Sequence, residues 1–123
     1  VLHRSHSERL IDRALAYMDA HLDEALSLAQ LAEYLQVNYN YLSGLFRKTV
    51  GVGFSTKLNQ LRMQRSAALL RDTPSSVQQI AKQVGYSNEK YFYRIFQSTF
   101  GMTPVTYRFR LQAGPGTRAE DKA

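Results

Sequence analysis

Apolar residues recur along the chain with the spacing of one face of an α-helix, and this pattern occurs twice. The copies cover residues 27–54 and 76–104, and each begins with apolar positions at i, i+3, i+4 and i+7. These apolar positions are Leu28, Leu31, Ala32, Leu35, Leu42, Leu45 and Phe46 in the first copy, and Val77, Ile80, Ala81, Val84, Phe92, Ile95 and Phe96 in the second. The offset is 49 positions in the first half of the repeat and 50 in the second half, so the second copy has gained one residue. The pattern predicts a duplicated unit of two helices joined by a short turn.

The first helix of each copy begins with the same polar signal. Ser27 is followed three positions later by Gln30, and Ser76 by Gln79. A serine and a glutamine at this spacing form a capping box, in which each side chain accepts from the backbone N–H of the other residue. Both helices are therefore expected to begin with such a box.

The turn inside each copy contains two informative positions. Asn38 and Ser87 are residue types that cap helix N-termini, so each is expected to begin the second helix of its copy. Gln36 occupies the turn position that Gly85 holds in the second copy. If the turn needs a left-handed residue there, Gln36 carries strain of about 1–2 kcal/mol.

The rest of the chain also reads as helix, and no strand pattern competes. Helices are expected over residues 8–22 and 56–71, and a last short helix from Thr103-Pro104. The predicted fold class is all-α, with about seven helices in a homeodomain-like arrangement. The predicted divisions are a first helix-turn-helix subdomain over 8–55, a linker helix over 56–72, a second helix-turn-helix subdomain over 73–111 and a disordered tail over 112–123.

Composition excludes several classes of protein. The chain has 123 residues and no cysteine, so neither a disulfide framework nor a thiolate metal site is available, and a cytoplasmic location is expected. No apolar run approaches the roughly 20 residues of a membrane helix. The three histidines have no acidic partner at ligand spacing, and no group of residues suggests catalysis, so neither a metal, nor a cofactor, nor an enzymatic activity is expected.

The net charge of +6 is concentrated in one part of the chain. Residues 1–46 carry three arginines against six acidic residues, whereas residues 47–110 carry eleven lysines or arginines against two. Such a distribution is typical of proteins that bind a polyanion. Two helix–turn–helix units in a basic chain favour double-stranded DNA, because the second helix of such a unit fits the major groove.

The outward faces of the two candidate reading helices carry side chains suited to bases and phosphates. On a helical wheel they are Asn40, Ser43, Gly44 and Arg47 in the first helix, and Lys90, Tyr93, Arg94 and Gln97 in the second, with Glu89 at its flank. Phosphate contacts are expected at the helix N-termini of Ser27 and Ser76, reinforced by Arg47, Lys48 and Gln97. For Arg62, Arg65, Arg108 and Arg110, phosphate contact and internal pairing are both open. The tyrosines are better explained as core and rim residues than as stacking platforms for single strands.

These residues together resemble the AraC/XylS-type bacterial transcription regulators. The resemblance covers about residues 8–111 and is carried by Ala32, Tyr41-Leu42-Ser43, Phe46-Arg47, Gly51, Arg62, Leu69-Leu70, Ile80-Ala81, Val84-Gly85-Tyr86, Tyr91-Phe92, Arg94, Phe96, Phe100-Gly101, Thr103-Pro104 and Tyr107-Arg108. It implies two helix-turn-helix subdomains bridged by a helix, which read successive major-groove segments and regulate transcription. The base-reading positions that it implies are Asn40, Ser43 and Gly44 in the first copy, and Glu89, Lys90, Tyr93 and Arg94 in the second.

The resemblance also implies partners and leaves alternatives. An effector-sensing or dimerisation portion would lie outside this chain, and RNA polymerase is a further candidate partner. Gly44 departs from the family, which often has a base-reading side chain there; it either allows close approach to the DNA backbone or reflects a loss of specificity. The second copy is therefore expected to read bases more sharply. The competing hypotheses are a helical adaptor that docks an acidic protein and a binder of structured RNA. A membrane is not expected as a partner under any of these hypotheses.

Overall fold

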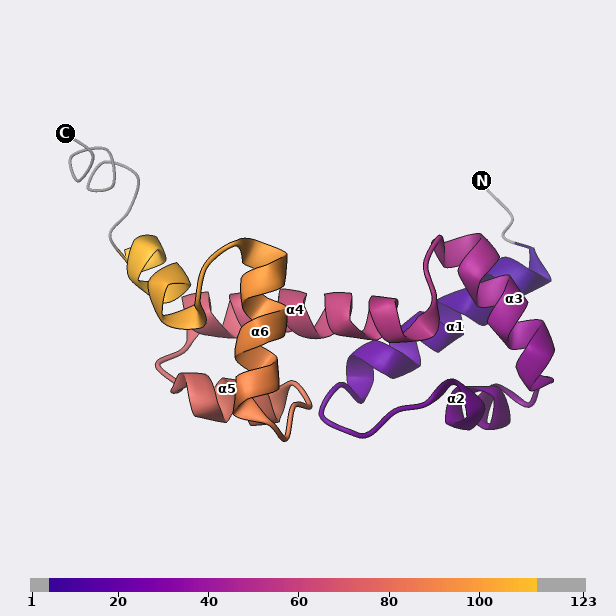
Figure 1. Ribbon diagram of the computed structural model, residues 1–123. Helices are drawn as coiled ribbons and strands as arrows, with labels where there is room; N and C mark the ends of the chain where they lie inside the picture. The colour runs from indigo at the N-terminus through magenta and orange to yellow at the C-terminus, as the bar shows by residue number, and fades with distance from the viewer. Residues whose placement is uncertain (1–4, 113–123) are drawn as a thin grey trace. The chain divides into compact units, whose positions relative to one another are not determined.

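The computed structural model describes residues 5–112, which contain helices and no strand (Figure 1). The helices are α1 (His6–Ala20), α2 (Leu28–Leu35), α3 (Tyr39–Val50), α4 (Phe54–Asp72), α5 (Val77–Gln83) and α6 (Glu89–Phe100), followed by a helical segment over residues 104–112. The predicted all-α class is thus confirmed. The predicted disordered tail lies outside the described residues, except for residue 112, which is helical.

Capping boxes begin α2 and α5, as the repeat predicted. Ser27 Oγ accepts from the backbone N–H of Gln30 at 3.1 Å, and Gln30 Oε1 accepts from the backbone N–H of Ser27 at 3.0 Å. Ser76 and Gln79 form the same pair of bonds. Each such cap contributes about 1 kcal/mol to helix stability.

The sequence interpretation missed a third capping box, at the start of the chain. Ser5 and Glu8 exchange the same two bonds, at 2.9 and 3.1 Å. As a result α1 begins at His6 rather than at residue 8, and it ends at Ala20 rather than at 22.

The turn between α2 and α3 requires left-handed backbone at its first residue. Gln36 has φ 59° and ψ 45°, and in residues 5–112 it is the one non-glycine residue with positive φ. Gly85, at the matching position, has φ 102°. The predicted left-handed conformation of Gln36 is therefore confirmed, and we expect this conformation to cost about 1–2 kcal/mol.

The expectation that Ser87 begins the helix after the second turn was wrong. Asn88 is the N-cap of α6, and its side chain accepts from the backbone N–H of Tyr91, as Asn38 accepts from that of Tyr41. Backbone bonds within the two turns match at an offset of 49, whereas the two caps match at an offset of 50. Ser87 is thus the added residue; α3 and α6 keep the same length of 12 residues, whereas α5 is one residue shorter than α2.

Two compact units divide at Leu61 and Arg62, within α4, and each is described by itself. In the first unit α1, α2 and α3 pack against one another. Its buried core consists of Leu10, Ile11, Ala14, Met18, Leu22, Leu31, Ala32, Leu35, Leu42, Phe46 and Leu58. The predicted apolar positions of the first copy lie in or against this core.

In the second unit α5 packs against α6, over residues of α4 (Figure 1). The core consists of Met63, Leu70, Ile80, Ala81, Val84, Tyr86, Phe92 and Phe96. Residues 91–100 reproduce the burial of residues 41–50 position by position. The two second helices of the repeat therefore sit in their cores in the same orientation.

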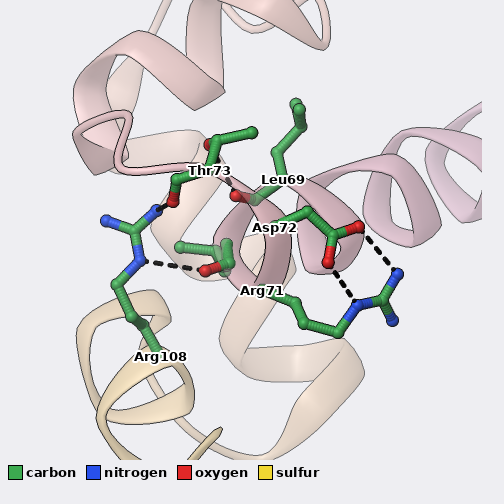
Figure 2. A network of polar contacts seen from close by, with 6 residues as sticks. Leu69, Arg71, Asp72, Thr73 and Arg108 are labelled. Atoms are coloured by element: carbon green, nitrogen blue, oxygen red, sulfur yellow. Dashed lines mark hydrogen bonds and ion pairs between the residues drawn. The ribbon is translucent and has the colours of Figure 1, made fainter. Parts of the chain in front are cut away.

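Arg108 ties the last helical segment to the end of α4, as Figure 2 shows. Its Nε donates to the carbonyl oxygen of Leu70 and its Nη2 to that of Thr73, each at 3.1 Å. These are carbonyls that a helix end leaves without partners. Of the two interpretations left open for Arg108, the structure therefore supports internal pairing.

Candidate nucleic-acid interface

The first candidate reading helix, α3, is held by an apolar inner face. Leu42 and Phe46 form this face and are buried in the core of the first unit. On its other side Asn40 and Gly44 are exposed and Ser43 is half-buried. The structure thus places all three predicted base-reading positions of this helix on its accessible side.

Gly44 is required neither by backbone geometry nor by packing. It lies within α3, and a Cβ atom built on it would meet no atom within 4 Å. A larger side chain would point into open space. The glycine therefore lowers the helix propensity of α3 and leaves its outer face without a side chain at this position.

The second candidate reading helix, α6, presents a longer and more polar set of side chains. Glu89, Lys90 and Arg94 are exposed, and Tyr93 is half-buried. Burial, and to a smaller extent the negative charge of Glu89, raises the pKa of Tyr93. A tyrosine hydroxyl group is protonated at neutral pH and can both donate and accept hydrogen bonds.

Arg94 does not extend freely into solvent. Its guanidinium carbon lies 5.4 Å from the centroid of the Tyr91 ring, within the range of a cation–π contact. The sequence interpretation treated Tyr91 only as a core or rim residue. The signal that it missed is the spacing of three, which places a tyrosine and an arginine side by side on a helix.

Two of the predicted phosphate-binding residues, Ser27 and Arg47, line one cavity of about 400 Å³ in the first unit. The start of α2 and the start of α4 both border it, the latter through Gly53 to Thr56. A Cβ at Gly53 would lie 2.9 Å from Nη2 of Arg47, so the glycine lets the guanidinium group lie against the backbone. Helix N-termini carry positive partial charge, so the cavity has a positive electrostatic character.

Capping changes which backbone groups these N-termini can offer. The N–H groups of Ser27 and Gln30 are already bonded within the box. The amides of Leu28 and Ala29, at the first and second helical positions, have no acceptor inside α2. Any anion at this N-terminus would therefore meet those two groups.

The other predicted phosphate contacts lie at accessible positions. Lys48 and Gln97 are exposed, and Gln97 occupies in α6 the position of Arg47 in α3. Ser76 is exposed and caps α5.

Arg62, by contrast, is buried inside the second unit. Its guanidinium carbon lies 5.3 Å from the centroid of the Tyr86 ring, and burial lowers its pKa. Burial raises the pKa of Tyr86 to about 12, an effect that the charge of Arg62 partly opposes. Of the two interpretations left open for Arg62, the structure again supports internal pairing.

Other kinds of site find no support in the part of the chain that the structure describes. Residues 5–112 contain no group of three or more histidine, aspartate or glutamate residues arranged to hold a metal ion. None of the described helices has the length and hydropathy needed to cross a membrane.

Comparison with known proteins identifies the family. A family model described as a helix-turn-helix domain matches residues 31–110. The regulatory protein PocR of Salmonella typhimurium is 38% identical over 96 residues, which cover 78% of this chain and 32% of PocR. A transcriptional regulator with an AraC-type DNA-binding domain, from Chromobacterium violaceum, superposes with a TM-score of 0.80 at 29% identity, over 88% of this chain and 96% of that chain. The chain belongs to the AraC-type helix-turn-helix family.

The fold of this AraC-type domain also matches that of a protein solved on DNA. The DNA-binding domain of AdpA, in complex with a target DNA, has a TM-score of 0.79 at 22% identity, over 84% of this chain and 93% of that chain. At this identity the likeness concerns the fold alone. The chain spans about a third of the length of PocR and of the melibiose operon regulatory protein of Escherichia coli, and 13% of the length of the transcriptional regulator YtdP of Bacillus subtilis.

Proposed function

We propose that this AraC-type domain binds double-stranded DNA in a sequence-specific manner and regulates transcription in bacteria, with α3 and α6 each entering the major groove. The observation that carries the proposal is the repetition of one exposed polar face. Residues 41–50 and 91–100 have the same burial at every position, and each range includes one fully buried phenylalanine, Phe46 or Phe96. A helix seated in this way offers one face to a groove.

The outer face of α6 carries the stronger candidates for base recognition. Arg94 and Lys90 are suited to guanine, and the Glu89 carboxylate can accept from the amino group of cytosine. Tyr93, which is half-buried, is limited to a partner that approaches closely. We therefore assign the sharper base reading to α6.

The outer face of α3 offers fewer reading groups. Asn40 is suited to adenine and Ser43 to either kind of base, while Gly44 has no side chain. This helix accordingly contributes more to affinity than to discrimination.

Phosphate binding is proposed at the cavity that Ser27 and Arg47 share. The unbonded amides at the start of α2 and a guanidinium group are complementary to a phosphate oxygen. Lys48, Ser76 and Gln97 are proposed as further backbone contacts. Such contacts fix the register of the protein on DNA without selecting a base.

Selection of bound sites from a random duplex library tests the proposal directly. We expect a defined site to emerge, and its affinity to fall with a log–log salt slope of about −0.9 per phosphate contact. Recovery of random sequence with the affinity of the starting library would overturn sequence-specific binding.

Arg94→Ala, compared with Arg71→Ala, separates base reading from general charge. Arg71 lies in the same unit and forms an exposed ion pair with Asp72 at 2.8 Å, outside the proposed interface (Figure 2). We expect Arg94→Ala to weaken binding to the selected site by about 1–3 kcal/mol and to remove preference at one base pair. Equal losses for both variants on selected and random duplex would support only electrostatic binding.

The adaptor hypothesis makes a different prediction. A basic surface that docks an acidic protein would bind an acidic polypeptide as well as it binds DNA of equal charge density. The repeated reading face favours DNA, and the similarity to the AraC-type transcriptional regulator from Chromobacterium violaceum supports this choice. We further propose that this activity takes place in the bacterial cytoplasm, because the chromosomal DNA lies there.

A further inference from the structure

Arg94 and Tyr91 form a pair on the outer part of α6. The guanidinium carbon of Arg94 lies 5.4 Å from the ring centroid of Tyr91, which is 38% exposed. An unrestrained arginine has many rotamers, and a side chain must give up that freedom when it binds a base. A ring that already holds the guanidinium group reduces this entropic cost.

Tyr91 can hold Arg94 because its own ring rests on the core. Its ring centroid lies 5.8 Å from that of Tyr86, which is 5% exposed. Tyr86 in turn contacts the buried ring of Phe92 at 5.5 Å and the guanidinium group of Arg62 at 5.3 Å. A continuous series of contacts therefore runs from the interior of the second unit to the exposed arginine.

We propose that Tyr91 is a positioning residue, which holds Arg94 on the outer face of α6 and so sharpens discrimination at the base pair that Arg94 reads. The proposal rests on the proposed function, because it assumes that Arg94 reads a base. It assigns to Tyr91 an effect on specificity that is separate from any contact of its hydroxyl group with DNA.

The first copy of the repeat provides an internal control. Tyr41 stands fifty positions before Tyr91, and it is also exposed, at 49%. The position that matches Arg94, however, is Gly44. Tyr41 therefore has the same place on its helix as Tyr91, without an arginine to position.

Four variants test the proposal, with the selected duplex and a duplex altered at the base pair whose preference Arg94→Ala removes. Tyr91→Leu removes the π-system, and Tyr91→Phe keeps it but lacks the hydroxyl group. Tyr41→Leu and Tyr41→Phe are the matched controls. The measured quantity is the ratio of the two dissociation constants, with thermal unfolding recorded for each variant.

We expect Tyr91→Leu to reduce this ratio about two- to fivefold, as the loss of an exposed cation–π contact implies. Tyr91→Phe should keep the ratio of the unchanged protein, even if both affinities fall. The Tyr41 variants should leave the ratio unchanged. In an Arg94→Ala background, Tyr91→Leu should have no further effect on the ratio, because the pair acts as one unit.

Two results would overturn the inference. One is a Tyr91→Leu variant that discriminates as well as the unchanged protein. The other is a Tyr91→Leu variant that loses the same affinity for both duplexes, in the Arg94→Ala background as well, and unfolds at a lower temperature. That result would indicate a purely structural role for Tyr91. If the unchanged protein itself shows no preference for any duplex, the proposed function fails. This outcome can be distinguished from the two results that would overturn the role of Tyr91.

Discussion

Arg62 lies over the ring of Tyr86 inside the second unit, with its guanidinium carbon 5.3 Å from the ring centroid. Both residues are at least nine-tenths buried. A charged group is costly to bury unless it is compensated, and the electron-rich face of an aromatic ring provides part of the compensation. This contact links α4 to the turn before α6, so it supports the helix proposed to read bases.

Arg62→Ala should therefore destabilise the second unit. We expect a loss of about 2 kcal/mol, the value of a desolvated cation–π contact, with additional loss from the packing of the arginine stem. Hydrogen exchange of the buried Ile80 and Ala81 amides in α5 reports this unit separately. Arg71→Ala, at an exposed ion pair, should leave those rates unchanged. Equal protection in Arg62→Ala and the unchanged protein would contradict the assigned role.

The Tyr86 hydroxyl group should make stability fall at high pH. The ordinary pKa of tyrosine is 10.0, and burial raises that of Tyr86 to about 12 in the folded state. Between these values the unfolded chain releases the proton and the folded chain retains it, so ionisation favours unfolding. The contribution of Tyr86 is fully present below pH 10 and is lost as pH rises through 12.

Urea unfolding at intervals from pH 9 to pH 12 measures this effect. Tyr86→Phe has no proton to release, so its free energy of unfolding should decline less steeply between pH 10 and pH 12. Parallel declines for the two proteins would show that other groups account for the loss.

Exchange of residue types between the two turns should shift stability in opposite directions. Gln36→Gly removes left-handed strain of about 1–2 kcal/mol and adds about 0.5–1 kcal/mol of backbone entropy cost. We therefore expect a net gain of about 0–1.5 kcal/mol from these two terms. Gly85→Gln, at φ 102°, should destabilise. Thermal unfolding of the two variants checks both signs, and a loss of stability in Gln36→Gly would show that its side chain has a stabilising role.

The repeat made much of this fold predictable, because each signal was local. Capping boxes and the left-handed turn residue depend on neighbours within five positions, and two copies of each signal supported one another. The cap of α6 was misplaced because Ser87 and Asn88 are adjacent and both of a capping type. Only the backbone bonds of the turn reveal that Ser87 is the added residue.

Distant contacts were not predictable in this way. Arg108 bonds to carbonyl groups 35 and 38 positions earlier in the chain. Its sequence neighbours carry no sign of that partner, and the same holds for Arg62 and Tyr86. The base-reading and phosphate residues remain predictions, which the variants described here test.

Arg108→Ala should weaken folding without changing the number of phosphate contacts. Loss of two hydrogen bonds from a charged group to the end of α4 should cost about 2 kcal/mol. The salt slope of DNA binding should stay the same, because the side chain is engaged with Leu70 and Thr73 (Figure 2). Arg71→Ala, at the exposed ion pair with Asp72, is the control for charge. A salt slope that falls by about one unit in Arg108→Ala would instead assign this arginine to phosphate.

Gly44→Arg should give α3 the pair that α6 already has. A Cβ at this position meets no atom within 4 Å, and Tyr41 lies three residues earlier, as Tyr91 does for Arg94. The substitution should raise stability by about 1 kcal/mol through helix propensity alone.

Gly44→Ala shares that gain in stability, so it serves as the control for binding. Relative to Gly44→Ala, we expect Gly44→Arg to bind tighter and to acquire a preference for guanine at one position of the site, worth about 1–3 kcal/mol. Site selection with both variants measures this preference. A gain in affinity without a new preference would mean that the arginine reaches only phosphate, and that the outer face of α3 does not approach base edges at residue 44.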